Sequence, residues 1–340
     1  MLKRILLFLL ILLTGLTIWY NQLILYALAQ GVGQLKVVWN SRPIEKVISD
    51  PLVADSVKDK LRYIAAVRKF AIDSIGLNNT SNYTTYYDQG GKELLWVVTA
   101  SERYRLRAKI WSFPVVGDMP YKGFFDPEKA KKEALALKEQ GLDVSVRNPG
   151  GWSTLGWFKD PVLSSMLDRS AGDLASLIMH EMAHATIFVK DSADFNENLA
   201  SFIGDQGARY FLKSYFGTGA PELETYLSDV MKYKKRSAHI LRGAIMLDSL
   251  YSAIQTIPDE KKEKHKQEMI LKIVSTLDTL NSGKEKLSAR FIKQLPNNTF
   301  FMSYIRYESR QTDFNELYQR DFHSDIRKMV EFYRINFPFL

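Results

Sequence analysis

Apolar residues recur along the chain with a spacing that changes from one stretch to the next. Over residues 56–75 the spacing is helical, which predicts an amphipathic helix. The stretch 83–125 differs, because short β-rich runs at 94–98 and 109–113 are separated by turn-forming residues. These runs predict the strands of a small sheet.

A further helix and strand are predicted before the pattern becomes helical. Residues 126–127, an Asp-Pro pair, are typical of a helix start, and Gly141 is typical of a helix end. Residues 143–146 then alternate as a strand does. From Ser170 onward the pattern is overwhelmingly helical, without internal repeats or low-complexity linkers. We therefore expect an α+β fold that is mostly α.

The N-terminus combines a basic start with a long apolar run. Lys3 and Arg4 precede an apolar stretch over residues 5–19, which continues through 23–25. This order favours an uncleaved signal anchor whose positive end stays in the cytoplasm. The catalytic part would then lie outside the cytoplasm, in a bacterial periplasm or cell envelope. The small residues at positions 27 and 29 offer a possible cleavage site, so the alternative is signal cleavage and secretion.

Three parts are expected along the chain. Residues 1–29 form the anchor or transmembrane segment, residues 30–169 a mixed α/β part with the small sheet, and residues 170–340 a helical part. The length after the anchor is ample for one large domain or two closely packed ones.

One helix of the last part carries an unusual pair of histidines. Ser170 and Asp173 match a capping box, which predicts where this helix begins. His180 and His184 are four residues apart, so both imidazoles lie on one helix face and can bind one zinc ion. Glu181 can then take a proton from a zinc-bound water, as in the H-E-x-x-H pattern of zinc-dependent hydrolases. The alternative is a core helix in which two histidines occur by chance.

A third metal ligand is predicted on the following helix. A turn over residues 190–194 precedes a helix that starts near Phe195 and has Glu197 at its beginning. Small residues would allow the two helices to approach closely: Ala200, Ser201 and Gly204. Two histidines, one glutamate and an open fourth position make a catalytic zinc arrangement. The alternative for Glu197 is a solvated carboxylate at a helix start.

These two motifs, residues 180–184 and 196–200, resemble zinc peptidases of the gluzincin type. More narrowly, the chain resembles the bacterial family described as putative aminopeptidases, from about Leu28 to its end. Other segments that carry the resemblance are residues 33–35, 42–44, 113–117, 120–126, 153–158, 160–161, 166–167, 297–298 and Tyr307. The resemblance implies a zincin-like fold, with a small β-sheet beside the helix that carries H-E-x-x-H, and it implies aminopeptidase activity.

One position departs from the gluzincin pattern. Many gluzincins have an acidic residue four positions after the ligand glutamate, where it orients a zinc-bound histidine. Here that position is Ser201, which can form a hydrogen bond but supplies no charge. Asp205, or a residue elsewhere, could take over this task.

The expected mechanism is hydrolysis of a peptide bond by water. Zinc held by His180, His184 and Glu197 would activate the water, and Glu181 would act as general base. The oxyanion needs a further donor, for which Tyr304 and Tyr307 are candidates on a predicted helix after Asn297. The resemblance favours Tyr307, and packing is the alternative role for both tyrosines.

The net charge and the cysteine content limit the binding partners and the chemistry that are possible for this chain. A net charge of +8 suits an anionic membrane surface better than nucleic acid, for which no motif is present. The mixed-charge run 259–266 predicts a solvated helix face or a corner between helices. The chain has no cysteine, which excludes disulfides, thiol nucleophiles and a cysteine-linked lipid anchor.

We therefore expect a membrane-anchored zinc metallopeptidase that acts on peptide substrates, in particular an aminopeptidase. A zinc endopeptidase or amidase acting on cell-envelope peptides is one alternative. A zinc-stabilised, non-catalytic interaction protein of the envelope is another, although a structural site has no need of a general base such as Glu181.

Overall fold

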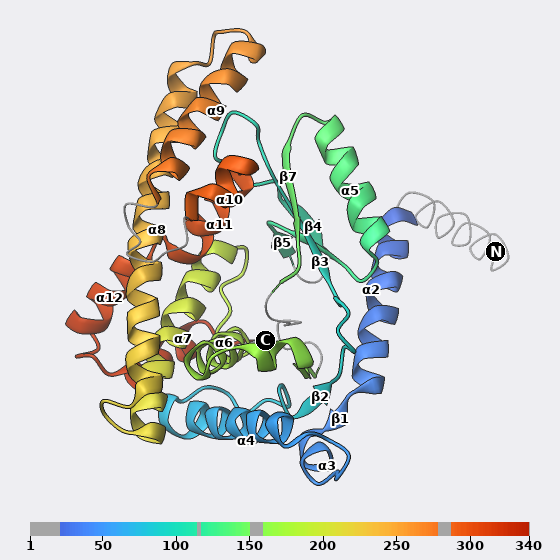
Figure 1. Ribbon diagram of the computed structural model, residues 1–340, viewed down its shortest axis with the longest axis vertical. Coiled ribbons are helices and arrows are strands. Elements are labelled where there is room, and N and C mark those ends of the chain that lie inside the picture. The colour runs from blue at the N-terminus through green and yellow to red at the C-terminus, as the bar shows by residue number, and fades with distance from the viewer. Residues whose placement is uncertain (1–20, 114–116, 150–158, 278–286, 340) are drawn as a thin grey trace, which may run out of the picture. The chain divides into compact units, whose positions relative to one another are not determined.

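The computed structural model describes residues 21–113, 117–149, 159–277 and 287–339 (Figure 1). The chain divides into two compact units, residues 1–41 and 42–340. The first unit contains α2 (Asn21–Asn40). Among the described residues, no helix is both long and apolar enough to cross a membrane. The predicted anchor lies largely outside the described residues, since residues 1–20 are not among them, and it stays a prediction.

The second unit is mostly helical and contains small sheets, which confirms the predicted α+β class. Its helices are α3 (Ile44–Ile48), α4 (Asp55–Phe70), η1 (Ala71–Ile75), α5 (Pro127–Glu139), η2 (Ser164–Asp168), α6 (Ala171–His184), α7 (Ala193–Phe216), α8 (Pro221–Ala253), α9 (Asp259–Ser275), α10 (Leu287–Lys293), α11 (Asn298–Glu308), α12 (Gln311–Arg320) and α13 (Ile326–Asn336). The predicted helix over 56–75 is α4 continued by the π-helical turn η1.

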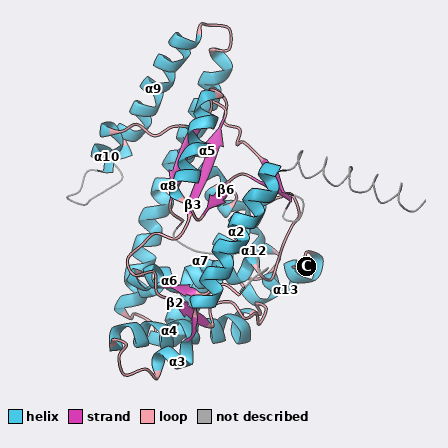
Figure 2. Cartoon of the chain, turned by 90° about the vertical axis from the view of Figure 1, so that its right-hand side faces the viewer, coloured by secondary structure: helices cyan, strands magenta, loops and turns pink. Residues whose placement is uncertain are grey.

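The strands are β1 (Arg42–Pro43), β2 (Thr85–Tyr87), β3 (Trp96–Ser101), β4 (Trp111–Phe113), β5 (Gly117–Met119), β6 (Lys122–Phe124), β7 (Asp143–Arg147) and β8 (Val162–Leu163). They form the sheets β6-β3-β7 and β1-β2-β8 and the pair β4-β5. Strand β3 is antiparallel to both of its neighbours, and α5 packs beside it (Figure 2). The predicted runs at 94–98, 109–113 and 143–146 correspond to β3, β4 and β7.

Local signals explain where α5 begins and ends. The Asp126 side chain accepts a hydrogen bond from the backbone N–H of Glu128, and Pro127 occupies the first helical position. Gly141 follows the helix with φ at +79°, a conformation that favours glycine. The helix predicted from residues 126–127 and Gly141 is confirmed.

The main apolar core joins residues from both sides of Ser170. Leu61, Ile64 and Val67 form a fully buried face on α4, and Leu174 and Ile178 are fully buried on α6. Their helical spacing places each set on one face, so the two helices bury apolar surface against each other. The boundary predicted between residues 169 and 170 stays a prediction.

Helices α6 and α7 approach closely because small residues lie between them. A Cβ atom on Gly204 would lie 2.7 Å from the Ser176 carbonyl oxygen, and one on Gly207 would lie 2.4 Å from Met179 Sδ. A larger side chain at position 204 would require movement of the α6 backbone, and one at position 207 would displace the Met179 side chain. This confirms the close approach predicted from Gly204.

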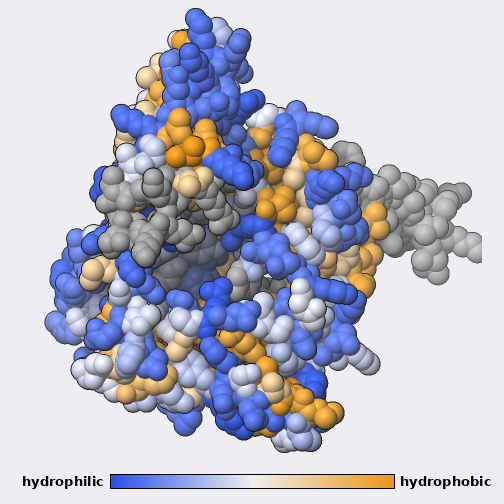
Figure 3. Space-filling view, in the orientation of Figure 1, coloured by the Kyte–Doolittle hydropathy of each residue, from blue (hydrophilic) through white to orange (hydrophobic). Residues whose placement is uncertain are grey.

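The charged run 259–266 is only partly solvated. Figure 3 shows mostly hydrophilic residues over the end of the unit where α8 and α9 meet, as predicted. Lys266 contradicts that prediction, because its side chain is 3% exposed and lies 2.6 Å from Asp143 on β7. It also donates to the Arg103 carbonyl at 3.0 Å. The sequence pattern could not reveal that this lysine faces a half-buried carboxylate more than one hundred residues away.

Candidate metal centre

The helix that carries the two histidines begins as predicted. Ser170 Oγ accepts a hydrogen bond from the Asp173 N–H at 3.2 Å and donates one to the Asp173 carboxylate at 2.8 Å. This cap fixes the first turn of α6, which then runs without interruption to His184. The rings of His180 and His184 lie on one face, with centroids 4.7 Å apart and planes at 83°.

Three donor atoms converge at this face. His180 Nε2 and His184 Nε2 are 3.1 Å apart, and Glu197 Oε2 lies 3.4 Å from the first and 3.3 Å from the second. A tetrahedral zinc ion with bonds of about 2.0–2.1 Å needs ligand atoms about 3.3 Å apart. The spacing and the donor types therefore fit such an ion. Within the described part of the chain, these three side chains form a group that could hold a metal ion.

Electrostatics support the pairing of these groups. Burial alone raises the pKa of Glu197, but the imidazoles of His184 and His180 outweigh it and hold that pKa well below its usual range. Burial lowers the pKa of His184, whereas the charge and hydrogen bond of Glu197 raise it above its usual value. Glu197 is thus an ionised carboxylate, which is the form that binds a metal ion.

Ser201 contacts one of the histidines, as its position allows. Its Oγ lies 3.4 Å from His180 Nδ1, which is the ring nitrogen that faces away from the three-atom cluster. Asp205, the other candidate for this task, accepts hydrogen bonds from Arg209 at 3.0 Å and from the Tyr226 hydroxyl at 3.1 Å. The neutral serine is therefore the second partner of His180, and this second bond orients the ring.

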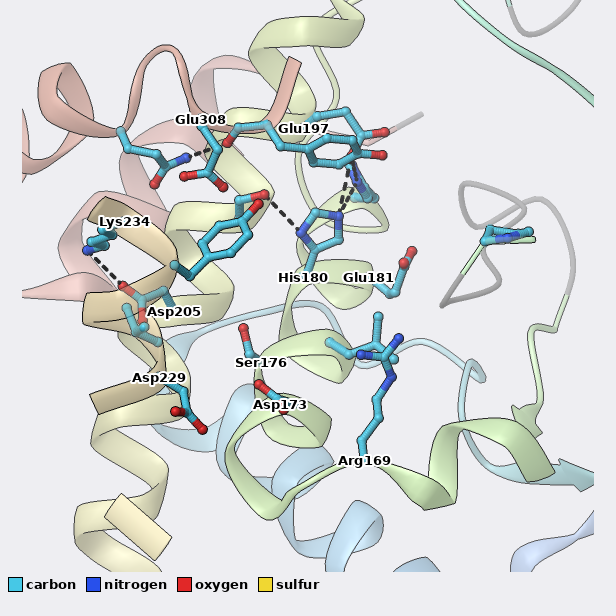
Figure 4. A pocket seen from close by; sticks show the side chains of 18 of the residues that line it. Arg169, Asp173, Ser176, His180, Glu181, Glu197, Asp205, Asp229, Lys234 and Glu308 are labelled. Atoms are coloured by element: carbon cyan, nitrogen blue, oxygen red, sulfur yellow. Dashed lines mark hydrogen bonds and ion pairs between the residues drawn. The ribbon is translucent and has the colours of Figure 1, made fainter. Parts of the chain in front are cut away.

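A cavity of about 730 Å³ opens beside the cluster (Figure 4). Glu181 lines it and is 9% exposed. Residues of β3 and β7 line the cavity as well as residues of α6, α7 and α8, so it lies between the sheet β6-β3-β7 and the helices. The arrangement leaves space for a peptide next to both Glu181 and the three donor atoms.

The two tyrosines that were candidates for an oxyanion donor have different surroundings in the structure. Tyr307 lines the cavity, and its ring centroid is 6.3 Å from that of His180. Tyr304 instead packs against Phe300 and Tyr233. It belongs to an apolar cluster that α8, α9 and α11 form apart from the main core. Of the two, only Tyr307 lies where it could contact a substrate.

Three side chains of the cavity were missed by the sequence prediction. Tyr121 lines it between β5 and β6, and burial together with the charge of Glu197 raises its pKa. Arg147, at the end of β7, hydrogen-bonds the Tyr307 hydroxyl. Glu308 directly follows Tyr307 on α11. Tyr121 belongs to a segment that carries the family resemblance, which was the one available signal for it.

Helix α11 is held at its beginning by Asn298, which is fully buried. Its Nδ2 donates to the Glu102 carbonyl at 2.8 Å, and its Oδ1 accepts from the Tyr251 hydroxyl at 2.6 Å. Its backbone N–H donates to the Asp143 carboxylate at 2.9 Å, the same carboxylate that pairs with Lys266. These bonds connect α11 to the loop after β3, to α8 and to β7.

A second buried asparagine, Asn198, holds the other end of α11. It follows Glu197 on α7, and its Nδ2 donates to the Arg306 carbonyl while its Oδ1 accepts from the Arg310 N–H at 2.9 Å. The Gln311 side chain also donates to the Asn198 carbonyl at 2.9 Å. The helix that carries Tyr307 is thus bound to the helix that carries Glu197.

Comparison with known proteins identifies the family. The family model described as "Putative aminopeptidase" matches residues 25–335, and the chain belongs to this family. Searches of the curated proteins and of the solved structures found no match. Residues 114–116 and 153–158, which contributed to the predicted resemblance, lie outside the described residues.

Proposed function

We propose that this member of the putative aminopeptidase family is a zinc-dependent peptidase with a zincin-like fold. One observation carries the proposal: the donor atoms of His180, His184 and Glu197 converge beside Glu181 in an open cavity. Two imidazoles and one carboxylate are a donor set that suits zinc. A structural site would have four protein ligands, whereas this one leaves room for water and substrate.

The proposed reaction is hydrolysis of a peptide bond. When bound, zinc supplies a Lewis acid that polarises the scissile carbonyl and lowers the pKa of water toward neutrality. Glu181 accepts the proton of the attacking water as the new carbon–oxygen bond forms. It then passes that proton to the leaving amine as the carbon–nitrogen bond breaks. Its position directly after His180 supports this role.

Tyr307 is proposed to stabilise the oxyanion of the tetrahedral intermediate. Burial, followed by the charge of Glu197, raises its pKa, so its hydroxyl keeps its proton at neutral pH. Arg147 hydrogen-bonds this hydroxyl, and a guanidinium can only donate. The phenolic hydrogen of Tyr307 therefore remains available for a bond to substrate. Tyr121, whose pKa burial also raises, is positioned for the same task.

The setting is also proposed. Residues 1–29 would anchor the protein in a bacterial membrane and hold the catalytic part on its outer side, where it would act on peptide substrates. The basic residues before the apolar run support this orientation.

The test compares the full-length protein with the variant Glu181→Gln. Both are assayed for bound zinc by elemental analysis and for cleavage of a peptide library by mass spectrometry. We expect equal zinc content and a loss of hydrolysis by a factor of about 10² to 10⁴, since general-base catalysis contributes this much. The control is Glu316→Gln, the same change at an exposed position of α12, which should match the wild type.

Two results would contradict the proposal. Equal hydrolysis by the wild type and Glu181→Gln would remove the proposed base. A wild-type protein that binds no zinc after metal supplementation would remove the metal centre itself. Internal cleavage of the peptides would establish an endopeptidase.

A further inference from the structure

Most carboxylates that line the cavity already have a partner of their own. Asp205 forms ion pairs with Arg209 at 3.0 Å and with Lys234 at 3.3 Å. Asp229 pairs with Lys232 at 2.8 Å. Glu197 belongs to the candidate metal centre and Glu181 lies beside it. These groups are satisfied by the protein or by the proposed metal site.

Asp173, which also lines the cavity, is exposed and hydrogen-bonds the Ser170 hydroxyl. Glu308 differs from all of these carboxylates. It is half-buried at the end of α11 and lines the same cavity. Among the residues that the structure describes, no lysine, arginine or histidine forms an ion pair with it. Its hydrogen-bond partner is the neutral hydroxyl of Tyr233. A half-buried carboxylate without a cation is complementary to a positively charged group of a ligand.

The surroundings of the Glu308 carboxylate destabilise its negative charge, so a positively charged ligand group would stabilise it. Burial raises its pKa to about 7, and Asp205 adds to the increase. Lys234 and Arg236 act on it from α8 and lower its pKa, but Lys234 is already bound to Asp205. The Arg236 guanidinium lies over the Tyr233 ring, so neither cation forms an ion pair with Glu308.

The position of Glu308 in the cavity indicates which positively charged group of a substrate it could bind. It directly follows Tyr307, whose ring centroid is 6.3 Å from that of His180. In Figure 4 it is drawn toward the end of the pocket that holds Glu197, whereas Asp173 and Asp229 are drawn at the opposite end. In a peptide with a free amino terminus, the α-ammonium lies two bonds from the carbonyl carbon of the first residue. Glu308 lines the same cavity as the three donor atoms, so its carboxylate can bind that ammonium while the carbonyl of the first residue faces the candidate metal centre.

We propose that Glu308 binds the free α-ammonium group of the substrate and restricts the enzyme to peptides with an unblocked amino terminus. This inference rests on the proposed peptidase function. It assigns the residue that an exopeptidase needs in order to recognise the end of a chain.

The test uses the full-length protein and a defined library of hexapeptides in two forms, with a free or an acetylated amino terminus. The wild type should cleave the free peptides at least about 10-fold more efficiently in kcat/KM, because acetylation removes the charge that Glu308 binds. Glu308→Gln should lose about 10- to 100-fold on free peptides, mainly through KM, and change less than about 2-fold on acetylated ones. Its zinc content should equal that of the wild type.

Two controls separate charge from structure. Glu316→Gln makes the same change on the exposed face of α12 and should leave both peptide series unaffected. Glu308→Asp keeps the charge with a shorter side chain and should retain part of the preference for free peptides. The preference of the wild type itself is measured without any variant, so a variant that does not fold leaves the test intact.

The possible results are distinguishable. A wild type that cleaves free and acetylated peptides equally overturns this inference and leaves the peptidase function standing. A preference for free peptides that Glu308→Gln retains in full assigns the ammonium to another residue and also overturns it. A wild type that cleaves neither series overturns both proposals.

Discussion

The candidate metal centre and helix α11, which brings Tyr307 to it, are built by different kinds of contact. His180, His184 and Glu197 come from two consecutive helices and lie within 18 residues of one another along the chain. Helix α11 is held by Asn198 and Asn298, whose partners are mostly more than one hundred residues away in sequence. The metal centre therefore depends on helical periodicity and a short connection, and the position of Tyr307 depends on buried polar bonds between distant segments.

This difference predicts that the two regions can be damaged separately. Loss of a ligand should abolish metal binding and leave the core intact. Loss of a buried amide should weaken the fold and displace α11, with the metal centre still able to form.

Removal of one ligand should have the largest effect on activity. We expect His184→Ala to lose its bound zinc and at least about 10³-fold in kcat/KM, because several kcal/mol of transition-state stabilisation come from the metal. Elemental analysis and peptide hydrolysis measure the two losses. A chelator should inactivate the wild type, and zinc should restore it but not the variant.

The matched control for this variant is His265→Ala, which removes an exposed histidine of α9. It should keep zinc and activity. Full zinc content in His184→Ala would show that the helix pair does not form the metal centre through this residue.

Loss of the buried amide of Asn298 should have an intermediate effect. Asn298→Ala leaves the Tyr251 hydroxyl and the Glu102 carbonyl without this partner, so we expect the free energy of unfolding to fall by about 2–3 kcal/mol. Displacement of α11 should lower kcat/KM by about 10-fold while zinc content stays at the wild-type level. Chemical denaturation, elemental analysis and peptide hydrolysis measure these quantities.

Asn336→Ala serves as its control, since Asn336 is exposed and its side chain donates a hydrogen bond to the Phe332 carbonyl of its own helix. Its unfolding free energy should differ little from that of the wild type. If Asn298→Ala also released zinc, the metal centre and α11 would not be independent, and the comparison between the two regions would be wrong.

The smallest effect is expected at Ser201. Its hydroxyl lies 3.4 Å from His180 Nδ1, at the long end of the hydrogen-bond range. Ser201→Ala should weaken zinc affinity by about 10-fold or less, the lower limit for loss of such an orienting partner. Competition with a chelator measures the affinity. Ser201→Asp, which introduces the acidic residue common in gluzincins, should tighten binding, and weaker binding would contradict the role of this position.

Local patterns predicted the elements near the metal centre well. The capping box at Ser170 and Asp173 marks the start of α6, and the helix expected near Phe195 begins two residues earlier, at Ala193. Caps and helical spacing act over three or four residues, so one sequence contains all the information that they need. Three strands, β3, β4 and β7, were also located. The strand order in the sheet β6-β3-β7 was not predicted, because pairing joins segments that are far apart in sequence.

By itself, the sequence determined the donor set His180, His184 and Glu197 and the nearby carboxylate Glu181, since the helical repeat brings residues four apart to one face. Only the tertiary structure decided which tyrosine reaches the cavity and that Lys266 is buried against Asp143. It also decided that Glu308 lines the cavity without an ion-pair partner among the residues it describes. Burial and charge pairing depend on every segment that packs around a side chain. The candidate metal centre could therefore be predicted from the sequence, and the side chain proposed to select a substrate could not.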